Sequence, residues 1–383
     1  MARSAVLLTL CAVLAMVLAG PTGHYPGPHS PKGFSPPWGQ PPWGQCNNRT
    51  MQIRKDFNKA TPQERKEYTD AINCVMTFPS NLNQTQYSGA INRYFDYATV
   101  HINLTQVVHL DGFFLVWHRM YVHLFEQDMR QNCGFRGPML YWNWPATAAD
   151  IDSTPIFNGD EYSMSGNGEY INAGPYQVGP NFTVPHGSGG GCVTSGPFAN
   201  HIITMQPSID PLFLLTGEPL PQTVFLKNES CLTRDLNSWV AQKFDNWTRL
   251  EDAINCPDQA CLASELNGAF GGADFGLHGG AHFAVGPPES NIFVSVQDPI
   301  WWPLHTMLDN IYVQWQKRHP EIADQLYGTM TANNVPPSAN ATLDSWTPDW
   351  GYFGPSMQIK DLISTTAGPF CYDYEWEDGP YTE

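Results

Sequence analysis

Charged side chains are scarce in this sequence, and basic ones especially so. Only 14% of its 383 residues are Asp, Glu, Lys or Arg, about half of the ~25% that is usual in soluble domains. The chain has 19 basic against 36 acidic residues, which gives a formal charge of −17. This deficit argues against electrostatic binding to nucleic acid or to an anionic membrane surface. We therefore expect small molecules as partners.

Long apolar runs are scarce as well. The one clear run, from Ala5 to Ala19, follows Arg3 and ends in small residues. It is shorter than the about 20 residues that a bilayer span needs. A basic start, a short apolar run and a small-residue end are typical of a cleaved secretory signal, here residues 1–19. We expect a secreted, extracellular protein without a membrane segment.

The sequence lacks any C-x-x-C pair, which argues against a zinc-thiolate site. Removal of the signal also removes Cys11. An even number of cysteines in an oxidising compartment favours up to four disulfides, although the sequence does not select among the possible pairings. The eight remaining cysteines are Cys46, Cys74, Cys133, Cys192, Cys231, Cys256, Cys261 and Cys371.

No charge run or low-complexity linker divides the chain after Cys46. Residues 20–45 hold eight prolines and six glycines, a composition that cannot bury enough apolar surface to fold alone. We therefore predict an N-terminal arm over residues 20–45 and one domain over residues 46–383.

Seven N-x-S/T triplets are present, more than chance would place in an exported chain, and they predict glycosylation at exposed positions. They begin at Asn48, Asn83, Asn103, Asn181, Asn228, Asn246 and Asn340.

Several segments have the periodicity of helices. The first has Thr61 as a candidate N-cap, with Pro62 at the first helical position. Between about 145 and 230, Gly, Pro, Asn and Ser dominate, and we expect a long irregular excursion. The predicted helices are 61–75, 85–100, 113–130, 235–253 and 304–318.

Two histidines, His278 and His282, have the i, i+4 spacing that places side chains one turn apart on a helix. Imidazoles at this spacing can bind one metal ion. The zinc protease motif H-E-x-x-H has a glutamate after its first histidine, whereas this chain has Gly279. The alternative is that the two histidines are unrelated residues near a helix start.

An earlier cluster contains His101, His109 and His118. Because nine residues separate the last two, they lie on opposite faces of a continuous helix and can share a metal only if the helix breaks between them. Asp111-Gly112 supplies such a break.

His123 lies on a different face of the helix from His118 and is interpreted as a packing or surface histidine. His305 precedes Asp309 by one helical turn, so this carboxylate could orient the imidazole. A plain surface pair is the alternative. In total, six histidines have suitable positions, and no cysteine or carboxylate is a candidate ligand. They suggest two metal sites of three histidines each, and imidazole is a ligand that suits copper, zinc and iron.

Two longer motifs extend this pattern. FLVWHRMY, from Phe114 to Tyr121, resembles the F-L-P-W-H-R-x-Y signature of the type 3 copper proteins, with Val116 in place of proline. DPIWWPLHTMLD, from Asp298 to Asp309, resembles the D-P-x-F-x-x-H-H-x-x-x-D signature of the same family. This family includes tyrosinases, catechol oxidases and molluscan haemocyanin units, and the chain is most similar to short secreted fungal polyphenol oxidases.

The resemblance implies a mainly α fold. Its core would be an antiparallel four-helix bundle that holds a dinuclear copper site, with extensive loops and disulfides. It further implies two copper ions and dioxygen as co-substrate, small phenolic substrates, and oxidation of o-diphenols to o-quinones. We expect a monomer or a small homo-oligomer. The ligands would be His101, His109 and His118 for copper A and His278, His282 and His305 for copper B.

The departures from the family pattern concern the surroundings of the copper site. Val107 occupies the position of a cysteine that is bonded to a copper histidine in many fungal members, so no thioether bridge is expected. Leu304 replaces the first histidine of the His-His doublet, near the substrate. Ile292 resembles the apolar residue over copper A, or packs in the core. Phe283 stands where some relatives have arginine, which favours neutral or cationic phenols.

Gly279 stands where several efficient monophenol hydroxylases have asparagine, which is thought to hold a water with a nearby acid. Asp274 is a candidate for this acid, or it caps the helix. Because glycine has no side chain to bind that water, we expect diphenol oxidation to exceed monophenol hydroxylation. The chain stops at Glu383 without the C-terminal lid of longer members, so we expect no lid-inhibited zymogen.

Four other functions compete with this prediction. Oxidation of o-aminophenols and full tyrosinase activity use the same copper pair. A haemocyanin-like oxygen carrier shares the six histidines but usually occurs as repeated units. A dizinc hydrolase would leave the two signatures unexplained.

Overall fold

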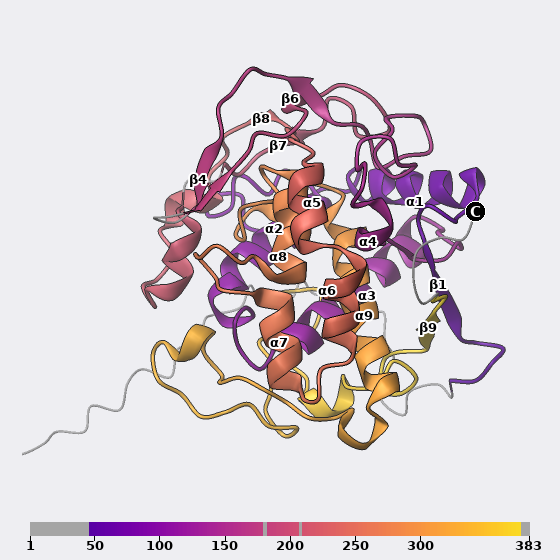
Figure 1. Cartoon of the computed structure of the whole chain (residues 1–383), viewed down its shortest axis with the longest axis vertical. Helices are drawn as coiled ribbons and strands as arrows, with labels where there is room; N and C mark the ends of the chain where they lie inside the picture. Colours follow the sequence, from indigo (N-terminus) through magenta and orange to yellow (C-terminus); the bar gives the residue numbers. More distant parts are fainter. Residues whose placement is uncertain (1–45, 179–181, 207–208, 377–383) are drawn as a thin grey trace, which may run out of the picture.

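The computed structural model describes residues 46–178, 182–206 and 209–376 (Figure 1). The fold is mainly helical, as predicted, with short strands at its edges. The antiparallel arrangement of a four-helix bundle stays a prediction. The predicted signal, residues 1–19, and the predicted arm, residues 20–45, lie outside the described residues. No helix within the described ranges combines the length and the apolar character that a bilayer crossing requires.

Helix α1, Pro62–Val75, begins where the sequence predicted. The Thr61 hydroxyl accepts a hydrogen bond from the Glu64 N–H at 3.2 Å, and the Glu64 carboxylate accepts one from the Thr61 N–H at 2.9 Å. These reciprocal bonds satisfy two backbone donors that would otherwise lack a partner. The predicted N-cap is therefore confirmed.

Four helices carry five of the six histidines that were predicted to bind metal. Two of these helices, α3 and α9, pack against each other (Figure 1). The predictions for 113–130 and 304–318 agree with the structure to within three residues. The helix predicted from residue 85 begins only at Arg93, because the Asn92 side chain accepts a hydrogen bond from the Phe95 N–H and caps it there. The four helices are α2 (Arg93–Leu104), α3 (Phe114–Asn132), α8 (Gly276–Val285) and α9 (Trp301–Arg318).

The single helix predicted for 235–253 is wrong. The structure has α5, Ser238–Phe244, and α6, Trp247–Ile254. The Asn246 side chain accepts a hydrogen bond from the Arg249 N–H and starts a second helix. The break allows α5 to pack against α8. A further helix that the sequence did not predict, α7 (Gln259–Asn267), also packs against α8.

The excursion between 145 and 230 is irregular, as predicted, apart from the short helix α4 (Trp144–Thr147) at its start, 3-10 turns and short two-stranded ladders. The ladders are too short to give a detectable alternation in the sequence. They pair β3 (Gly168–Tyr170) with β6 (Gly190–Val193), β4 (Tyr176–Val178) with β5 (Phe182–Val184), and β7 (Ile202–Ile203) with β8 (Ser230–Cys231).

A three-stranded sheet joins the two ends of the described chain. Strand β1, Gln52–Asp56, lies between β2, Leu140–Tyr141, and β9, Tyr372–Tyr374, and is parallel to both. Figure 1 shows β1 in indigo beside β9 in yellow. The predicted four disulfides are present, and one of them closes this end of the molecule. They are Cys46–Cys371, Cys74–Cys133, Cys192–Cys231 and Cys256–Cys261.

The predicted glycosylation positions are mostly exposed. The Asn246 side chain, which caps α6, is half-buried, and Asn181 lies outside the described residues. Glycosylation itself stays a prediction. The exposed positions are Asn48, Asn83, Asn103, Asn228 and Asn340.

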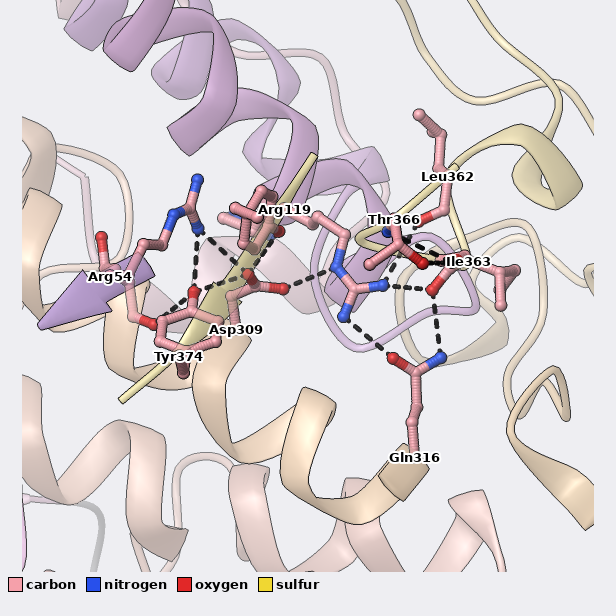
Figure 2. A network of polar contacts seen from close by, with 12 residues as sticks. Arg54, Arg119, Asp309, Gln316, Leu362, Ile363, Thr366 and Tyr374 are labelled. Carbon is pink, nitrogen blue, oxygen red and sulfur yellow. Dashed lines mark hydrogen bonds and ion pairs between the residues drawn. The ribbon is translucent and has the colours of Figure 1, made fainter. Parts of the chain in front are cut away.

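A buried ionic network ties α3 and α9 to the sheet (Figure 2). Asp309 on α9 accepts hydrogen bonds from Arg119 Nε on α3 at 2.6 Å and from Arg54 Nη1 on β1 at 3.2 Å. The hydroxyls of Tyr372 and Tyr374 on β9 donate to the same carboxylate at 2.6 and 2.7 Å. One carboxylate thus fixes the relative positions of four elements.

Glu126 on α3 completes the charge balance. It accepts hydrogen bonds from Arg54 Nη2 at 2.9 Å and from Arg130 Nη2 at 2.7 Å. Burial alone would raise the pKa of Glu126, but Arg54 and Arg130 outweigh burial and lower this pKa to about 2. A lowered carboxyl pKa stabilises the fold above the pKa of the unfolded chain, and this contribution is lost as pH falls toward the folded pKa.

We expect Glu126→Gln to destabilise the protein by about 3 kcal/mol at pH 7, because the variant leaves buried Arg54 without its full charge partner. The deficit should shrink as pH falls from about 4.5 toward 2, where wild-type Glu126 is itself protonated. Urea unfolding of both proteins at several pH values measures this.

Glu251→Gln is the control. Glu251 pairs with Arg318 at the surface, where its side chain is 55% exposed, so we expect a change below about 0.5 kcal/mol at every pH. A Glu126→Gln deficit that is absent at pH 7, or that persists undiminished at low pH, would contradict the assigned role of this carboxylate.

Candidate metal centre

The first histidine triad forms where the chain between α2 and α3 turns back. His101 lies near the end of α2 and His118 on α3, and His109 comes from the connection between these helices. One ring nitrogen of each lies within 4.8 Å of the other two. All three side chains are buried, with at most 3% exposed.

The predicted break in the helix is confirmed. Leu110, next to His109, has a φ of 52° in the left-handed region, which is unusual for a branched side chain and typical of functional sites. At Gly112 a Cβ would lie 2.4 Å from the Ala341 Cβ, so only glycine allows this turn to pack against the later loop.

The second triad spans α8 and α9. The Nε2 atoms of His278 and His282 are 3.0 Å apart, and they lie 3.3 and 3.2 Å from Nε2 of His305. The two histidines of α8 face the same point, as their i, i+4 spacing predicted.

The two triads adjoin each other. The ring of His118 stacks on that of His305, with 4.9 Å between centroids. Trp301 also stacks on His305, with 3.7 Å between centroids, and it packs edge-to-face against His101 at 5.5 Å. The six imidazoles therefore form one cluster that could hold two metal ions.

Hydrogen bonds fix the tautomer of two ligands. His109 Nδ1 donates to the Thr105 carbonyl at 2.9 Å, and His118 Nδ1 donates to the Phe114 carbonyl at 2.8 Å. Because a carbonyl only accepts, each Nδ1 carries the proton and each Nε2 presents a lone pair. Nε2 of His118 and both ring nitrogens of His101 are buried without a hydrogen-bond partner.

Burial also keeps the six rings neutral. Burial is the main cause that lowers the pKa of every one of them, and repulsion from neighbouring rings adds to it at most positions. The pKa of His109 falls to about 4 and that of His282 to about 3. Neutral imidazole nitrogens that converge in this way can bind a metal cation, and imidazole suits copper. The residues present therefore fit a copper pair.

Sequence reasoning missed one acidic residue at this centre. Glu289 is fully buried, and its Oε2 lies 2.6 Å from His282 Nδ1. When Nε2 of His282 binds a metal, Nδ1 carries the proton and donates to this oxygen. The other oxygen, Oε1, has no hydrogen-bond partner. A carboxylate on the second nitrogen orients a metal-binding imidazole. Glu289 lies in the loop after α8, where neither periodicity nor a motif indicates it.

The sequence suggested that the Asp309 carboxylate orients His305, but in the structure Asp309 binds arginines and tyrosines instead. Asp309 does not orient His305, because its oxygens accept from Arg119, Arg54 and two tyrosines on the side of α9 that faces the sheet. Nδ1 of His305 has no hydrogen-bond partner. Helical spacing placed the two residues one turn apart, but the buried arginines determine where the carboxylate points.

A cavity of about 850 Å³ opens onto the centre and reaches five of the six histidines, all but His118. Gly279, Ile292 and Asp274 line it. Leu304 is fully buried in α9 and is not among the described residues that line the cavity.

Asp274 has partners of its own. Its Oδ1 accepts hydrogen bonds from Arg249 Nη2 and from the Gly276 N–H, each at 3.0 Å. It therefore binds the first turn of α8 while it faces the cavity. His123 is buried against Phe370, with 5.1 Å between ring centroids, and lies outside the cavity lining.

We expect Glu289→Ala to weaken copper binding at the second triad about 10- to 100-fold, because His282 loses the acceptor that holds its ring. Glu289→Gln, whose amide oxygen can still accept, should retain more copper. Metal content per chain after dialysis against graded chelator measures the effect.

Asp245→Asn is the matched control. Asp245 is also a buried carboxylate beside α8, where it packs against Gly280 rather than a histidine. We expect it to keep two copper ions. Equal copper affinity in Glu289→Ala and wild type would contradict the role of Glu289.

Comparisons with known proteins agree with this geometry. The family model for the common central domain of tyrosinase matches residues 91–318. N-acetyl-6-hydroxytryptophan oxidase of Emericella nidulans is 33% identical over 86% of this chain and 94% of its own length. Tyrosinase P of Aspergillus terreus is 34% identical over 84% of this chain and 91% of its own.

A solved structure extends the similarity to the fold. Polyphenol oxidase from Thermothelomyces thermophila, in a form with one glycine-to-asparagine substitution, superposes with a TM-score of 0.81 at 31% identity. The match covers 87% of this chain and 91% of that one. With the family model, two relatives above 30% identity and two histidine triads in agreement, the chain belongs to the tyrosinase family of type 3 copper proteins.

Proposed function

We propose that this tyrosinase-family oxidoreductase oxidises o-diphenols to o-quinones and reduces dioxygen to water. One observation supports this most directly. Two triads of largely buried imidazoles, each with its ring nitrogens converging, adjoin a cavity of about 850 Å³ that is large enough for an aromatic ring. Each diphenol loses two electrons and two protons, so two diphenols reduce one dioxygen to two waters.

The two copper ions, when bound, supply the electron transfer between the diphenol and dioxygen. The chain's own residues hold and shield the site. His109 and His118 are fixed by backbone carbonyls and His282 by Glu289, so their Nε2 atoms keep one orientation. Aromatic and aliphatic side chains at the cavity wall exclude water and pack against the substrate ring.

Phe275 and Phe283 form part of this wall. Their rings stack with 4.0 Å between centroids, and both line the cavity. Ile292, half-buried, also lines it. An apolar wall beside the metal centre favours a substrate that presents its two oxygens to the metals and its ring to hydrocarbon.

The size of the cavity also favours this proposal over a haemocyanin-like carrier. A carrier binds only dioxygen, which needs no space of this size. Two of the relatives are named as an oxidase of a hydroxylated aromatic compound and as a tyrosinase, which supports an enzyme that acts on phenols. Oxidation of o-aminophenols needs the same centre and is the second candidate.

We further propose that the protein works outside the cell. Four disulfides in the described chain suit an oxidising compartment. The predicted signal over residues 1–19 and the exposed sequons are consistent with export.

The copper-loaded protein should convert catechol to o-quinone and consume one dioxygen for every two catechols. Recording quinone absorbance together with oxygen uptake measures this ratio. Apoprotein and zinc-loaded protein serve as controls, and both should be inactive. Oxygen binding without any quinone from catechols or aminophenols would favour the carrier instead.

Monophenols should react more slowly than diphenols, because Gly279 offers no side chain to hold a water at the centre. A Cβ at Gly279 would contact only the Phe275 Cβ, at 3.4 Å, so a larger residue fits. We expect Gly279→Asn to raise the ratio of tyramine to catechol turnover at least threefold, which corresponds to a transition-state difference of at least about 0.65 kcal/mol.

Gly279→Ala is the control, because it adds the Cβ without the amide. Its ratio should stay near that of wild type. If wild type hydroxylated tyramine without a lag and as fast as it oxidised catechol, the ranking of the two activities would be wrong.

A further inference from the structure

The cavity is larger than a single catechol ring needs. At about 850 Å³ it has the size of clefts that hold drug-sized ligands. Its inner end is formed by histidines such as His101 and His305, which are 1% exposed. Its outer end is formed by side chains that are about half exposed, including Ile171 at 47% and Leu212 at 44%. The lining therefore has two parts at different depths.

The outer part is built by the strands of the irregular region, which supply no metal ligand. Tyr176 and Val178 come from β4, and Ile171 directly follows β3. A Cβ at Gly190 on β6 would lie 2.7 Å from the Ile171 side chain and 3.0 Å from His186 Nε2. These two side chains therefore rest on the bare backbone of Gly190 and line the cavity together.

Acidic side chains outnumber Lys and Arg in the cavity lining. Four of the described acidic residues line the cavity, namely Asp210, Asp235, Asp274 and Glu289, and Asp274 pairs with Arg249. Arg234 is the one Lys or Arg among the described lining residues, and both Asp298 oxygens accept from it at 2.8 and 2.6 Å. Its remaining terminal nitrogen donates to backbone carbonyls. Among the described lining residues, no Lys or Arg is therefore free to pair with an anionic substrate at the outer end.

We propose, on the basis of the proposed function, that the preferred substrate is an o-diphenol extended by a second ring or a comparable apolar group. The diphenol end reaches the histidines, and the extension lies against Ile171 and Tyr176. The far end of the extension is neutral or cationic, because a carboxylate there would face acidic side chains without a partner. Ile171 is a specificity-determining residue for the extension.

Steady-state rates with four substrates test this assignment. They are catechol, 4-phenylcatechol, and 4-phenylcatechol with either an aminomethyl or a carboxyl group on the outer ring. We expect kcat/KM to rise at least tenfold from catechol to 4-phenylcatechol, mainly through KM. The amine should exceed the carboxylate at least fivefold, and this ratio should narrow as salt rises from about 0.05 to about 0.5 M.

Two isoleucine variants distinguish the loss of a contact with the substrate extension from a general effect of truncating a side chain. Ile171→Ala should raise KM for 4-phenylcatechol at least threefold and leave catechol unchanged. Ile202→Ala is the matched control, because Ile202 is 45% exposed, also belongs to the irregular region, and does not line the cavity. It should leave both substrates unchanged.

The outcomes distinguish the two proposals. Turnover of catechol without any gain for 4-phenylcatechol, or an Ile171→Ala effect equal on both substrates, overturns the extended site and leaves the diphenol oxidase in place. Absence of turnover with all four substrates in the copper-loaded protein overturns the proposed function itself. A carboxylate preferred over the amine overturns the charge assignment.

Discussion

The structure depends on burying six imidazoles whose ring nitrogens converge in two triads. The second triad has three Nε2 atoms within 3.3 Å of one another, and the first triad has nitrogens without a hydrogen-bond partner. Both arrangements are costly to bury unless a cation lies between the rings. The surrounding scaffold must therefore hold the rings before the metal arrives. Such preorganisation limits what the metal has to reorder on binding and explains why rigid helices supply five of the six ligands.

Two devices provide this rigidity. Around the first triad, backbone carbonyls of Thr105 and Phe114 hold the imidazoles, so the local chain path sets their orientation. Around the second triad, the Glu289 carboxylate holds His282. Behind both, Asp309 joins α3 and α9 to the sheet through two arginines and two tyrosines (Figure 2). The network binds the two helices that present the stacked pair of His118 and His305.

Several features could be predicted from the sequence because they depend on local chemistry. Thr61 and Pro62 indicated the start of α1, and the Asp111-Gly112 turn indicated the break that brings His109 back. Other predictions failed because a distant partner decided the outcome. The arginines that bind Asp309 come from β1 and α3, and the split at Asn246 lets α5 approach α8.

The sequence by itself indicated the two histidine triads, an upper limit of four disulfides and the family, since these depend on residue types at characteristic spacings. Only the tertiary structure decided which carboxylate serves a histidine, how the cysteines pair and how far the cavity extends. Those features arise between segments far apart in the chain, such as β3, β4 and the loop after α8. Spacing along a chain specifies which side chains share a helix face, but packing among distant elements specifies where each side chain finds its partner.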